Sequence, residues 1–364
     1  MTGQRDVWCI IGAGMGGKGL AAQLGVDGLR LRIHDIDEAQ IAGMRAAGGL
    51  HVEGRGDRTF APVELATTDL ASAVRGAAVI LVSTYGNAHP DVARQLAPLL
   101  ENGQVIVLIQ GHFTGSLTFR AALDSAGCKV KVDISEMDAY PYMLTVKSPD
   151  RVLMTSIKET WSLATLPASR SAAVMAKVAP AFPGLKAAPS LLHTAFTDLG
   201  GLFHVAGIIT NVAMVEKPGD YNFYASNMVP SVCRLITAFD EERVAVAQAY
   251  SITVADVRSW LAATYNFHHP TLEAALQEMA VTHYRYAPAP KSLEHRYLVQ
   301  DVACDLVPIA ALGKIANVPT PAMDAAIGLA NALTGRDFIA EGRNAQSLGL
   351  SNKSVAQIIE YVTG

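Results

Sequence analysis

The sequence carries little net charge, few cysteines and no long uninterrupted apolar run. Among its 364 residues, 29 Lys and Arg stand against 33 Asp and Glu, which gives a net charge of −4. That balance provides no electrostatic attraction to nucleic acid or to an anionic membrane surface. No stretch approaches the ~20 consecutive apolar residues that span a bilayer. We therefore expect no nucleic-acid partner and no membrane segment.

Cysteine pairs and metal-ligand spacings are absent as well. The four cysteines stand far apart, as Cys9, Cys128, Cys233 and Cys304. Without a C-x-x-C pair, they exclude a zinc ribbon and a disulfide scaffold. His268, His269 and His283 lack a paired cysteine and the H-E-x-x-H spacing, so we expect structural roles for them and no metal site. The start of the chain shows no signal-peptide pattern, and with the unpaired cysteines this predicts a cytoplasmic protein.

What the sequence does have is apolar material in two successive patterns. Half of the residues are hydrophobic, and the length suggests two domains. In the first half, short apolar runs alternate with helical patterns, which predicts an α/β fold with a doubly wound parallel sheet of the Rossmann type. The predicted strands are Val7–Ile11, Leu29–His34, Ala78–Ser83, Val105–Ile109, Val130–Ile134 and Val152–Ile157. The predicted helices between them are Gly16–Leu24, Asp37–Ala47, Ala88–Leu100 and Ser116–Ser125.

After Pro189 the pattern changes to long helices with few strand signals. The predicted helices are Val229–Tyr250, Val254–Tyr265, Asp301–Ala316, Pro321–Thr334 and Ser354–Val362. We place the boundary within Gly184–Ser190, so that residues 1–186 form a dinucleotide-binding domain and residues 187–364 an all-helical substrate and catalytic domain. A cleft between two such domains is the expected active site.

A glycine-rich loop is the first functional signal. Residues 12–17 read G-A-G-M-G-G, a G-x-G-x-x-G that follows an apolar strand and leads into an apolar helix. In that context the first glycine permits a tight turn, the second lets the backbone approach a pyrophosphate, and the third allows close helix–strand packing. The helix N-terminus adds free N–H groups. We therefore expect the cofactor to be bound at Gly12, Ala13, Gly14, Met15 and Gly17.

The residue at the end of the second strand bears on the choice of cofactor. Asp35 lies eighteen residues after Gly17, where a carboxylate accepts hydrogen bonds from the ribose hydroxyls and repels a 2′-phosphate. This predicts NAD as the cofactor. Arg30, Arg32 and Arg45 lie nearby in the sequence and keep NADP open as an alternative.

Two further polar residues follow the strand Ala78–Ser83. Ser83 and Thr84 stand at its carboxyl end, where parallel strands line a ligand crevice, so they are candidates for cofactor contacts. The alternative is that they cap the next helix.

The helical half contains three residues of chemical interest. His204 lies in a mainly apolar segment, and Arg296 precedes Asp301 by five residues, just before an apolar helix. Taken singly, each has an ordinary explanation. The histidine fits a core position, the aspartate fits a helix N-cap, and the arginine fits a surface ion pair.

Taken together, an ordered series of motifs resembles the octopine/nopaline dehydrogenases, the opine dehydrogenase family. The resemblance covers nearly the whole chain. The series runs through IIGAGMGGKGLAAQL, HDID, Pro141-Tyr142, Thr165–Ala168, His204, Asn211, the segment Asp220–Ala247, RYLVQD at Arg296–Asp301, Val318–Pro321 and Gly335–Leu350.

This resemblance implies a function and a set of catalytic residues. Members of the family use NAD(P)H to condense the amine of an amino acid with a 2-oxo acid, so the implied substrates are an amino acid or amine and a 2-oxo acid. By the same resemblance, His204 corresponds to the catalytic histidine, Asp301 to its aspartate partner and Arg296 to the family's arginine. These residue types suit a proton donor near neutral pH, its orienting carboxylate and a clamp for a substrate carboxylate.

The chain departs from the family at several places. Thr145 stands where the family has an arginine after its P-Y pair, and His112 or Tyr140 are candidates to replace it. The turn after the fifth strand reads Gln110-Gly111-His112 instead of N-P-G. These differences leave the identities of both substrates open.

Two other classes of protein remain as alternatives. A ketopantoate-reductase-like or glycerol-3-phosphate-dehydrogenase-like enzyme would depend on a catalytic lysine, for which Lys217, Lys291 and Lys314 are the candidates. A non-catalytic dinucleotide sensor would need none of the three residues implied by the resemblance. The oligomeric state is also open, with a homodimer as one alternative.

Overall fold

The computed structural model describes residues 6–57, 59–217, 219–285 and 289–364. The chain forms two compact units. The first unit comprises the chain up to Gly111, residues Gly115–Thr194 and the C-terminal Val362–Gly364. The second comprises His112–Thr114 and Ala195–Tyr361. The change from the first unit to the second at Thr194 lies eight residues beyond the boundary expected at 186.

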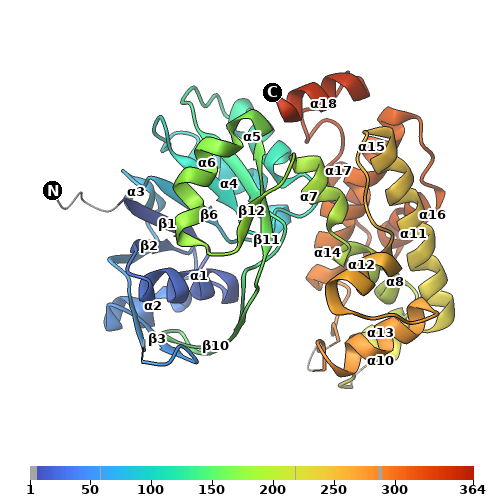
Figure 1. The fold of residues 1–364 in the computed structure, drawn as a ribbon, viewed down its shortest axis with the longest axis horizontal. Coiled ribbons are helices and arrows are strands. Elements are labelled where there is room, and N and C mark those ends of the chain that lie inside the picture. The colour runs from blue at the N-terminus through green and yellow to red at the C-terminus, as the bar shows by residue number, and fades with distance from the viewer. Residues whose placement is uncertain (1–5, 58, 218, 286–288) are drawn as a thin grey trace. The chain divides into compact units, whose positions relative to one another are not determined.

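The first unit is built on an eight-stranded sheet with the strand order β12-β11-β8-β7-β6-β1-β2-β5 (Figure 1). Its strands are β1 (Val7–Ile11), β2 (Arg30–His34), β5 (Leu65–Thr67), β6 (Val79–Val82), β7 (Val105–Leu108), β8 (Asp133–Met137), β11 (Trp161–Leu166) and β12 (Leu185–Ala187). The six strands from β5 to β8 are parallel, whereas β11 is antiparallel to β8. The predicted doubly wound Rossmann-type fold is therefore confirmed.

Alternating side chains explain why this sheet is covered on both faces. In β1, Trp8 and Ile10 belong to one apolar cluster, while Cys9 and Ile11 belong to another. Strands β6 and β7 divide their residues in the same way, as expected for a period of two. The first cluster is completed by helices α1 (Met15–Val26), α2 (Glu38–Ala47) and α6 (Ser171–Val178). The second is completed by α3 (Leu70–Val74), α4 (His89–Leu96) and α5 (Gly115–Ser125).

One predicted strand belongs to a different sheet. The run Val152–Ile157 lies in β10 (Arg151–Ile157), which is part of a second, four-stranded sheet with the order β4-β3-β10-β9. The other strands are β3 (Gly49–Glu53), β4 (Phe60–Pro62) and β9 (Tyr142–Ser148). Strand β10 forms an antiparallel hairpin with β9, so it cannot continue the parallel order of the main sheet.

Another prediction placed a strand too early. Of the predicted run Val130–Ile134, only the last two residues belong to β8, which begins at Asp133 and continues through Met137. Its later residues are polar but buried and hydrogen-bonded. The Ser135 and Thr165 hydroxyl oxygens lie 3.0 Å apart, and the Glu136 carboxylate accepts a hydrogen bond from the Ser116 amide at 2.7 Å. Their polarity concealed the strand in the sequence.

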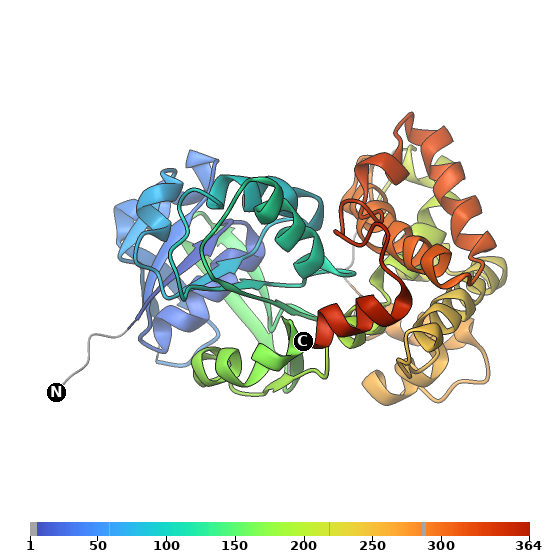
Figure 2. The same ribbon diagram turned by 90° about the horizontal axis from the view of Figure 1, so that it is seen from above.

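In the described part of the second unit, every regular element is helical (Figure 2). The elements are the end of α7 (Leu191–Thr197), then α8 (Gly200–Ile209), α9 (Val212–Val215), α10 (Phe223–Asn227), α11 (Pro230–Ala249), α12 (Val257–Tyr265), α13 (Leu272–Val281), α14 (Arg296–Asp301), η4 (Val302–Leu306), α15 (Val307–Ala316), α16 (Pro321–Thr334), α17 (Phe338–Glu341) and most of α18 (Val355–Thr363). Helix α8 packs against α14 and α11. None of the described helices has both the length and the apolar character required to cross a bilayer.

The helix that carries Asp301 begins earlier than predicted. Helix α14 starts at Arg296, with His295 as its N-cap, and runs through a π-helical segment, η4, into α15. Asp301 is therefore the last residue of α14 inside a continuous helical segment, and it is not an N-cap. The sequence concealed this start because the cap is a histidine, which is not among the preferred capping residues.

Candidate functional site

The glycine loop of the first unit has the geometry that a bound dinucleotide requires. Gly12 has a φ of 97°, and a Cβ there would lie 2.5 Å from the carbonyl oxygen of Ser83. A Cβ on Gly17 would lie 1.8 Å from the Gly12 oxygen, so both positions exclude any side chain. At Gly14, by contrast, a Cβ would meet no described atom within 4 Å. The loop therefore leaves no room for a side chain at Gly12 and Gly17, whereas the space at Gly14 is open and the backbone there can approach a phosphate.

The start of α1 leaves its N–H groups available. Its N-cap, Gly14, offers no capping side chain, and the first turn contains no acidic residue. The Met15 side chain that follows is 62% exposed. A helix N-terminus in this condition attracts an anion through its unpaired N–H groups and its dipole. The residues present therefore fit the pyrophosphate of a dinucleotide.

Asp35 lies directly beside this loop. One carboxylate oxygen accepts a hydrogen bond from the Ala13 amide at 2.6 Å, and the other accepts one from the Asp37 amide at 2.9 Å. Because each oxygen has a second lone pair, the carboxylate can brace the loop and still accept a ribose hydroxyl. Asp35 is half-buried, so it is accessible to a ligand.

The cations near Asp35 differ from those that the sequence suggested. Arg30 pairs with Glu64, Arg45 pairs with Glu38, and Arg32 donates to the backbone oxygens of residues 72 and 75. The cation on the Asp35 side is Lys18, which is buried and donates to the Gln40 side chain at 2.9 Å. Burial lowers the pKa of Lys18, and the charges of Asp35 and Asp37 oppose that effect. Sequence reasoning overlooked Lys18 because it lies inside the apolar helix.

Ser83 and Thr84 lie against the glycine turn. The Thr84 methyl group would be 3.2 Å from a Cβ on Gly12. The Ser83 and Tyr140 hydroxyl oxygens are 3.0 Å apart. Among the described residues, none forms a hydrogen bond with the buried hydroxyl of Thr84. Neither side chain caps the following helical turn, Gly86–Ala88, for which Tyr85 is the N-cap residue.

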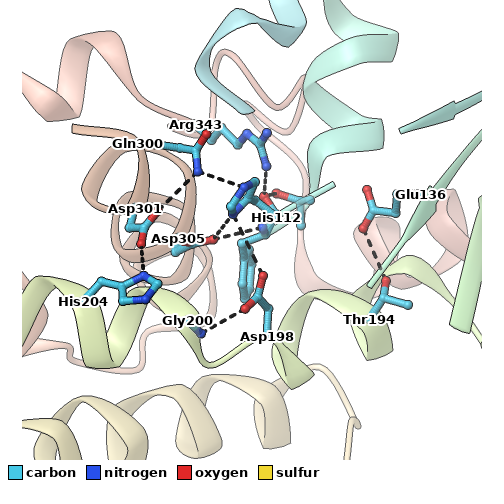
Figure 3. A network of polar contacts seen from close by, with 12 residues as sticks. His112, Glu136, Thr194, Asp198, Gly200, His204, Gln300, Asp301, Asp305 and Arg343 are labelled. Carbon is cyan, nitrogen blue, oxygen red and sulfur yellow. Dashed lines mark hydrogen bonds and ion pairs between the residues drawn. The ribbon is translucent and has the colours of Figure 1, made fainter. Parts of the chain in front are cut away.

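In the second unit, the histidine and aspartate singled out by the resemblance are in contact. Nδ1 of His204 in α8 lies 2.6 Å from Oδ2 of Asp301 in α14 (Figure 3). Burial favours the neutral acid, but the hydrogen bond and charge of His204, assisted by the charges of His112 and Arg296, outweigh it and lower the pKa of Asp301. Asp301 is thus an ionised, buried carboxylate that orients the imidazole.

Two tyrosines complete the surroundings of His204. The Tyr297 ring stacks on the imidazole, with ring centroids 3.6 Å apart and an interplanar angle of 7°. The Tyr224 hydroxyl lies 3.0 Å from Nε2. Burial raises the pKa of Tyr224 well above its usual value, so the hydroxyl keeps its proton beside Nε2. Nε2 thus faces an exchangeable polar partner, whereas Nδ1 is fixed. Neither tyrosine was predicted, although Tyr297 lies within the RYLVQD motif.

Arg296 stands at the start of α14 beside Tyr297. It is the first residue of α14, and its guanidinium lies 5.0 Å from the centre of the Tyr297 ring. No carboxylate of the described residues forms an ion pair with it, unlike an ordinary surface arginine. The expected surface ion pair is therefore not found in the described part of the chain, and the planar fork remains available for a ligand carboxylate.

A second group of histidine and carboxylates adjoins this pair. Nε2 of His112 lies 2.9 Å from the Gln300 amide nitrogen, which is also 3.3 Å from Oδ1 of Asp301 (Figure 3). Nδ1 of His112 lies 3.6 Å from Asp305 and 4.0 Å from Asp198. Burial and the like charge of Asp305 raise the pKa of Asp198 to about 6. Of these residues the sequence had singled out only His112, as a candidate to replace the family's arginine. Gln300, Asp198 and Asp305 were not candidates, because their contacts with His112 join segments far apart in the chain.

Three of these residues could in principle hold a metal ion. One ligand atom each from His112, Asp198 and Asp305 lies within 4.8 Å of the others. Ligands of a tetrahedral zinc ion, at about 2.0 Å from the metal, stand roughly 3.3 Å apart, closer than the 3.6 and 4.0 Å observed here. The arrangement fits a hydrogen-bonded network better than a closed metal site.

The three histidines suspected from the sequence alone have local partners. His268 contacts the side chain of Asn266 at 2.9 Å, and His269 pairs with Glu278. The His283 ring packs against Tyr265, with centroids 4.6 Å apart. These contacts agree with structural roles.

Known proteins match both the helical part of this chain and the chain as a whole. The family described as NAD/NADP octopine/nopaline dehydrogenase, alpha-helical domain, matches residues 187–334. An opine dehydrogenase from Arthrobacter sp. (strain 1C) is 32% identical over 355 residues, which cover 98% of each chain.

Solved structures share the fold. An octopine dehydrogenase bound to NADH and L-arginine has a TM-score of 0.78 at 19% identity, over 99% of this chain and 98% of that one. A yersinopine dehydrogenase bound to NADP⁺ has a TM-score of 0.73 at 15% identity, over 99% and 98% of the two chains. The full-length match to a curated relative favours neither the lysine-dependent reductases nor a non-catalytic sensor. The chain belongs to the NAD/NADP octopine/nopaline dehydrogenase family, the opine dehydrogenases, as the ordered motifs predicted.

Proposed function

We propose that this protein condenses the amine of an amino acid or related amine with a 2-oxo acid and reduces the product to a secondary amine, with His204 as the proton donor. In the reverse direction it oxidises a CH–NH donor. The observation that carries this assignment is the 2.6 Å contact between Nδ1 of His204 and Oδ2 of Asp301. It fixes one ring nitrogen on a carboxylate and leaves Nε2 as the nitrogen that exchanges a proton with substrate.

The chemistry divides between the two units. The amine and the 2-oxo acid lose water to form a C=N bond, and NADH or NADPH, bound at the glycine loop, supplies the hydride that reduces its carbon. The nitrogen needs one proton for charge balance. The His204 imidazolium carries that proton on Nε2, and the Asp301 carboxylate stabilises the charged ring. The Tyr224 hydroxyl, 3.0 Å from Nε2, must give way when substrate is bound.

Arg296 supplies the carboxylate contact of the proposed site. Its guanidinium has no carboxylate partner among the described residues and lies 5.0 Å from the centre of the Tyr297 ring. The relatives solved with L-arginine and with pyruvate suggest these two compounds as the first substrates to test. NAD is the preferred cofactor in this proposal because of Asp35, and NADP is the alternative.

A two-substrate assay tests the function. NADH or NADPH oxidation should require an amine and a 2-oxo acid together, and His204→Asn and Asp301→Asn should each lower kcat at least about 100-fold with little change in cofactor binding. His268→Asn, an exposed histidine with only a local partner, is the matched control and should retain wild-type turnover. Turnover with a lone carbonyl substrate would favour a ketopantoate-reductase-like reaction instead. That alternative lacks support from Lys291, which is exposed and pairs with Asp220.

The state of the protein in the cell is a separate part of the proposal. The four cysteines of the chain are free, which suits the reducing cytoplasm. A homodimer is the proposed assembly, because the helical unit exposes large apolar side chains such as Val281 and Ile339. Light scattering of the purified full chain tests it, and a monomer at micromolar concentration would contradict it.

A further inference from the structure

The backbone around His112 is held in an unusual conformation. Gln110, His112 and Thr114 all have φ near 56–59°, a left-handed region that residues other than glycine seldom occupy. The two polar backbone groups of Phe113 are bound within the second unit, its amide to Asp305 at 3.2 Å and its carbonyl to the Arg343 guanidinium at 2.7 Å. Such strain persists only where surrounding contacts determine it. These contacts therefore hold the backbone of His112 in a fixed position.

The hydrogen bonds of Gln300 determine which nitrogen of His112 carries its proton. The Gln300 atom nearest Asp301 must be the amide nitrogen, because an ionised carboxylate only accepts hydrogen bonds. The same NH₂ group faces Nε2 of His112 at 2.9 Å, so Nε2 must be an acceptor. In a neutral ring the proton is then on Nδ1, which forms no hydrogen bond with the described residues and lies 3.6 Å from Asp305 and 4.0 Å from Asp198. The two hydrogens of the Gln300 amide group are thus directed to Nε2 of His112 and Oδ1 of Asp301.

We propose that Gln300 and His112 are positioning residues for the catalytic pair: His112 holds the Gln300 amide, and the amide holds Asp301 with Oδ2 aimed at His204. This proposal rests on the function assigned above. Asp301 has two oxygens, and the contact on Oδ1 prevents the carboxylate from rotating away from the imidazole. His112 acts only through its acceptor nitrogen. Neither residue touches the reacting atoms.

Protonation of His112 would break this arrangement. Burial opposes a charge on the ring, but the charges of Asp305, Asp198 and Asp301 outweigh it and raise the pKa of His112. The cation Arg343 donates to the carbonyl of the next residue, Phe113. A proton on Nε2 would face the Gln300 NH₂ group, and the amide would have to turn its oxygen toward Asp301. Turnover should therefore fall on the acid side through an ionisation that belongs to His112.

Four variants separate this role from a structural one. Gln300→Leu should lower kcat about 10- to 100-fold with KM changed less than about twofold, because a small displacement of a catalytic group has effects of that size. His112→Leu should lose nearly as much. His112→Gln keeps an acceptor at similar reach and should retain at least about a third of wild-type kcat, without the acid-side ionisation. The double variant Gln300→Leu/His112→Leu should be no worse than Gln300→Leu, since both act through one bond.

A proton resonance provides a readout that does not need turnover. The short Nδ1–H bond from His204 to Asp301 should give a strongly low-field proton signal, assigned by its loss in His204→Asn. The signal should persist in wild type and His112→Gln, and should move or broaden in folded Gln300→Leu. Thermal melting of each variant excludes misfolding, and His268→Gln is the control histidine.

The outcomes are distinct. An unchanged signal in Gln300→Leu, additive losses in the double variant, or equal losses in His112→Gln and His112→Leu would each overturn the proposal. If wild type instead shows the expected signal and its Gln300 dependence but no two-substrate turnover, the proposed function fails and the positioning arrangement stands.

Discussion

Replacing Asp198 with Asn should stabilise the protein about twice as much at pH 8 as at pH 5. The side chain lies just before α8, with 15% of it exposed, and its Oδ1 accepts a hydrogen bond from the Gly200 amide at 3.0 Å. Burial, followed by the like charge of Asp305, raises its pKa from 3.8 to about 6. The folded protein therefore holds a proton on Asp198 at pH values where the unfolded chain has released it.

The sign and size of the effect follow from this difference. Between about pH 4 and pH 6 the folded state binds more protons than the unfolded state, so the free energy of unfolding falls as the pH rises through that interval. About 2 pK units at roughly 1.4 kcal/mol per unit give a ceiling of about 3 kcal/mol above pH 6. The charge of Asp198 also attracts His112, and that attraction is lost in the variant, so we expect a net gain of about 1–2 kcal/mol at pH 8. At pH 5 the gain should be about half as large.

Urea denaturation at pH 5 and pH 8 measures both quantities. Asn preserves the acceptor for Gly200, so the variant changes charge more than shape. Asp256→Asn is the matched control, because Asp256 caps α12 through hydrogen bonds from the Ser259 and Arg258 amides, and these lower its pKa. That substitution should destabilise the protein at pH 8, the opposite sign. If Asp198→Asn destabilises equally at both pH values, the buried-charge argument is wrong.

Three further predictions concern the cofactor and the proton donor. Gly14→Ala should leave the melting temperature nearly unchanged but weaken NADH binding, measured by fluorescence titration, at least about tenfold. Gly17→Ala should lower the melting temperature, because its Cβ would overlap the Gly12 oxygen. Unchanged NADH binding in Gly14→Ala would show that the loop does not bind phosphate. Tyr224→Phe should keep at least about a fifth of wild-type kcat/KM, since a tyrosine with a raised pKa is a poor acid; a loss comparable to that of His204→Asn would assign the proton to the tyrosine. Asp35→Ser should raise the ratio of NADPH to NADH kcat/KM at least about tenfold, and an unchanged ratio would show that this carboxylate does not read the ribose.

The parts of the fold that the sequence predicted well are those with a strong hydrophobic period. Strands β1, β6 and β7 are continuous apolar runs that divide their side chains between two clusters, and they were located within one residue at each end. The second sheet was missed because its strands are short or half-exposed, as in β9, where buried and exposed residues alternate beside polar ones. Strand β8 was displaced because Ser135 and Glu136 are buried with hydrogen-bond partners that only the fold supplies.

The functional site divides in the same way. His204, Asp301 and Arg296 were identified through a resemblance, and their spacing alone could not bring residues 97 positions apart into contact. The RYLVQD motif does contain two of the residues that were overlooked, Tyr297 and Gln300, and a helix starting at Arg296 would have placed both near Asp301. The contact between Gln300 and His112 spans 188 positions, and no periodicity reports on such a pair.

The helical segment from α14 to α15 places two carboxylates close together, and histidines from elsewhere in the second unit compensate their charges. Asp301 and Asp305 are four residues apart, so they lie on the same helical face, where two like charges destabilise a helix. Both face α8, and the approach is close: a Cβ on Gly201 would lie 2.6 Å from that of Asp305. Each carboxylate lies beside its own histidine: Asp301 is 2.6 Å from His204, and Asp305 is 3.6 Å from His112. His112 thus lies beside the second carboxylate on that face, and the Gln300 amide joins the two pairs. Removing the charge of Asp305 should therefore disturb the His204–Asp301 pair through His112.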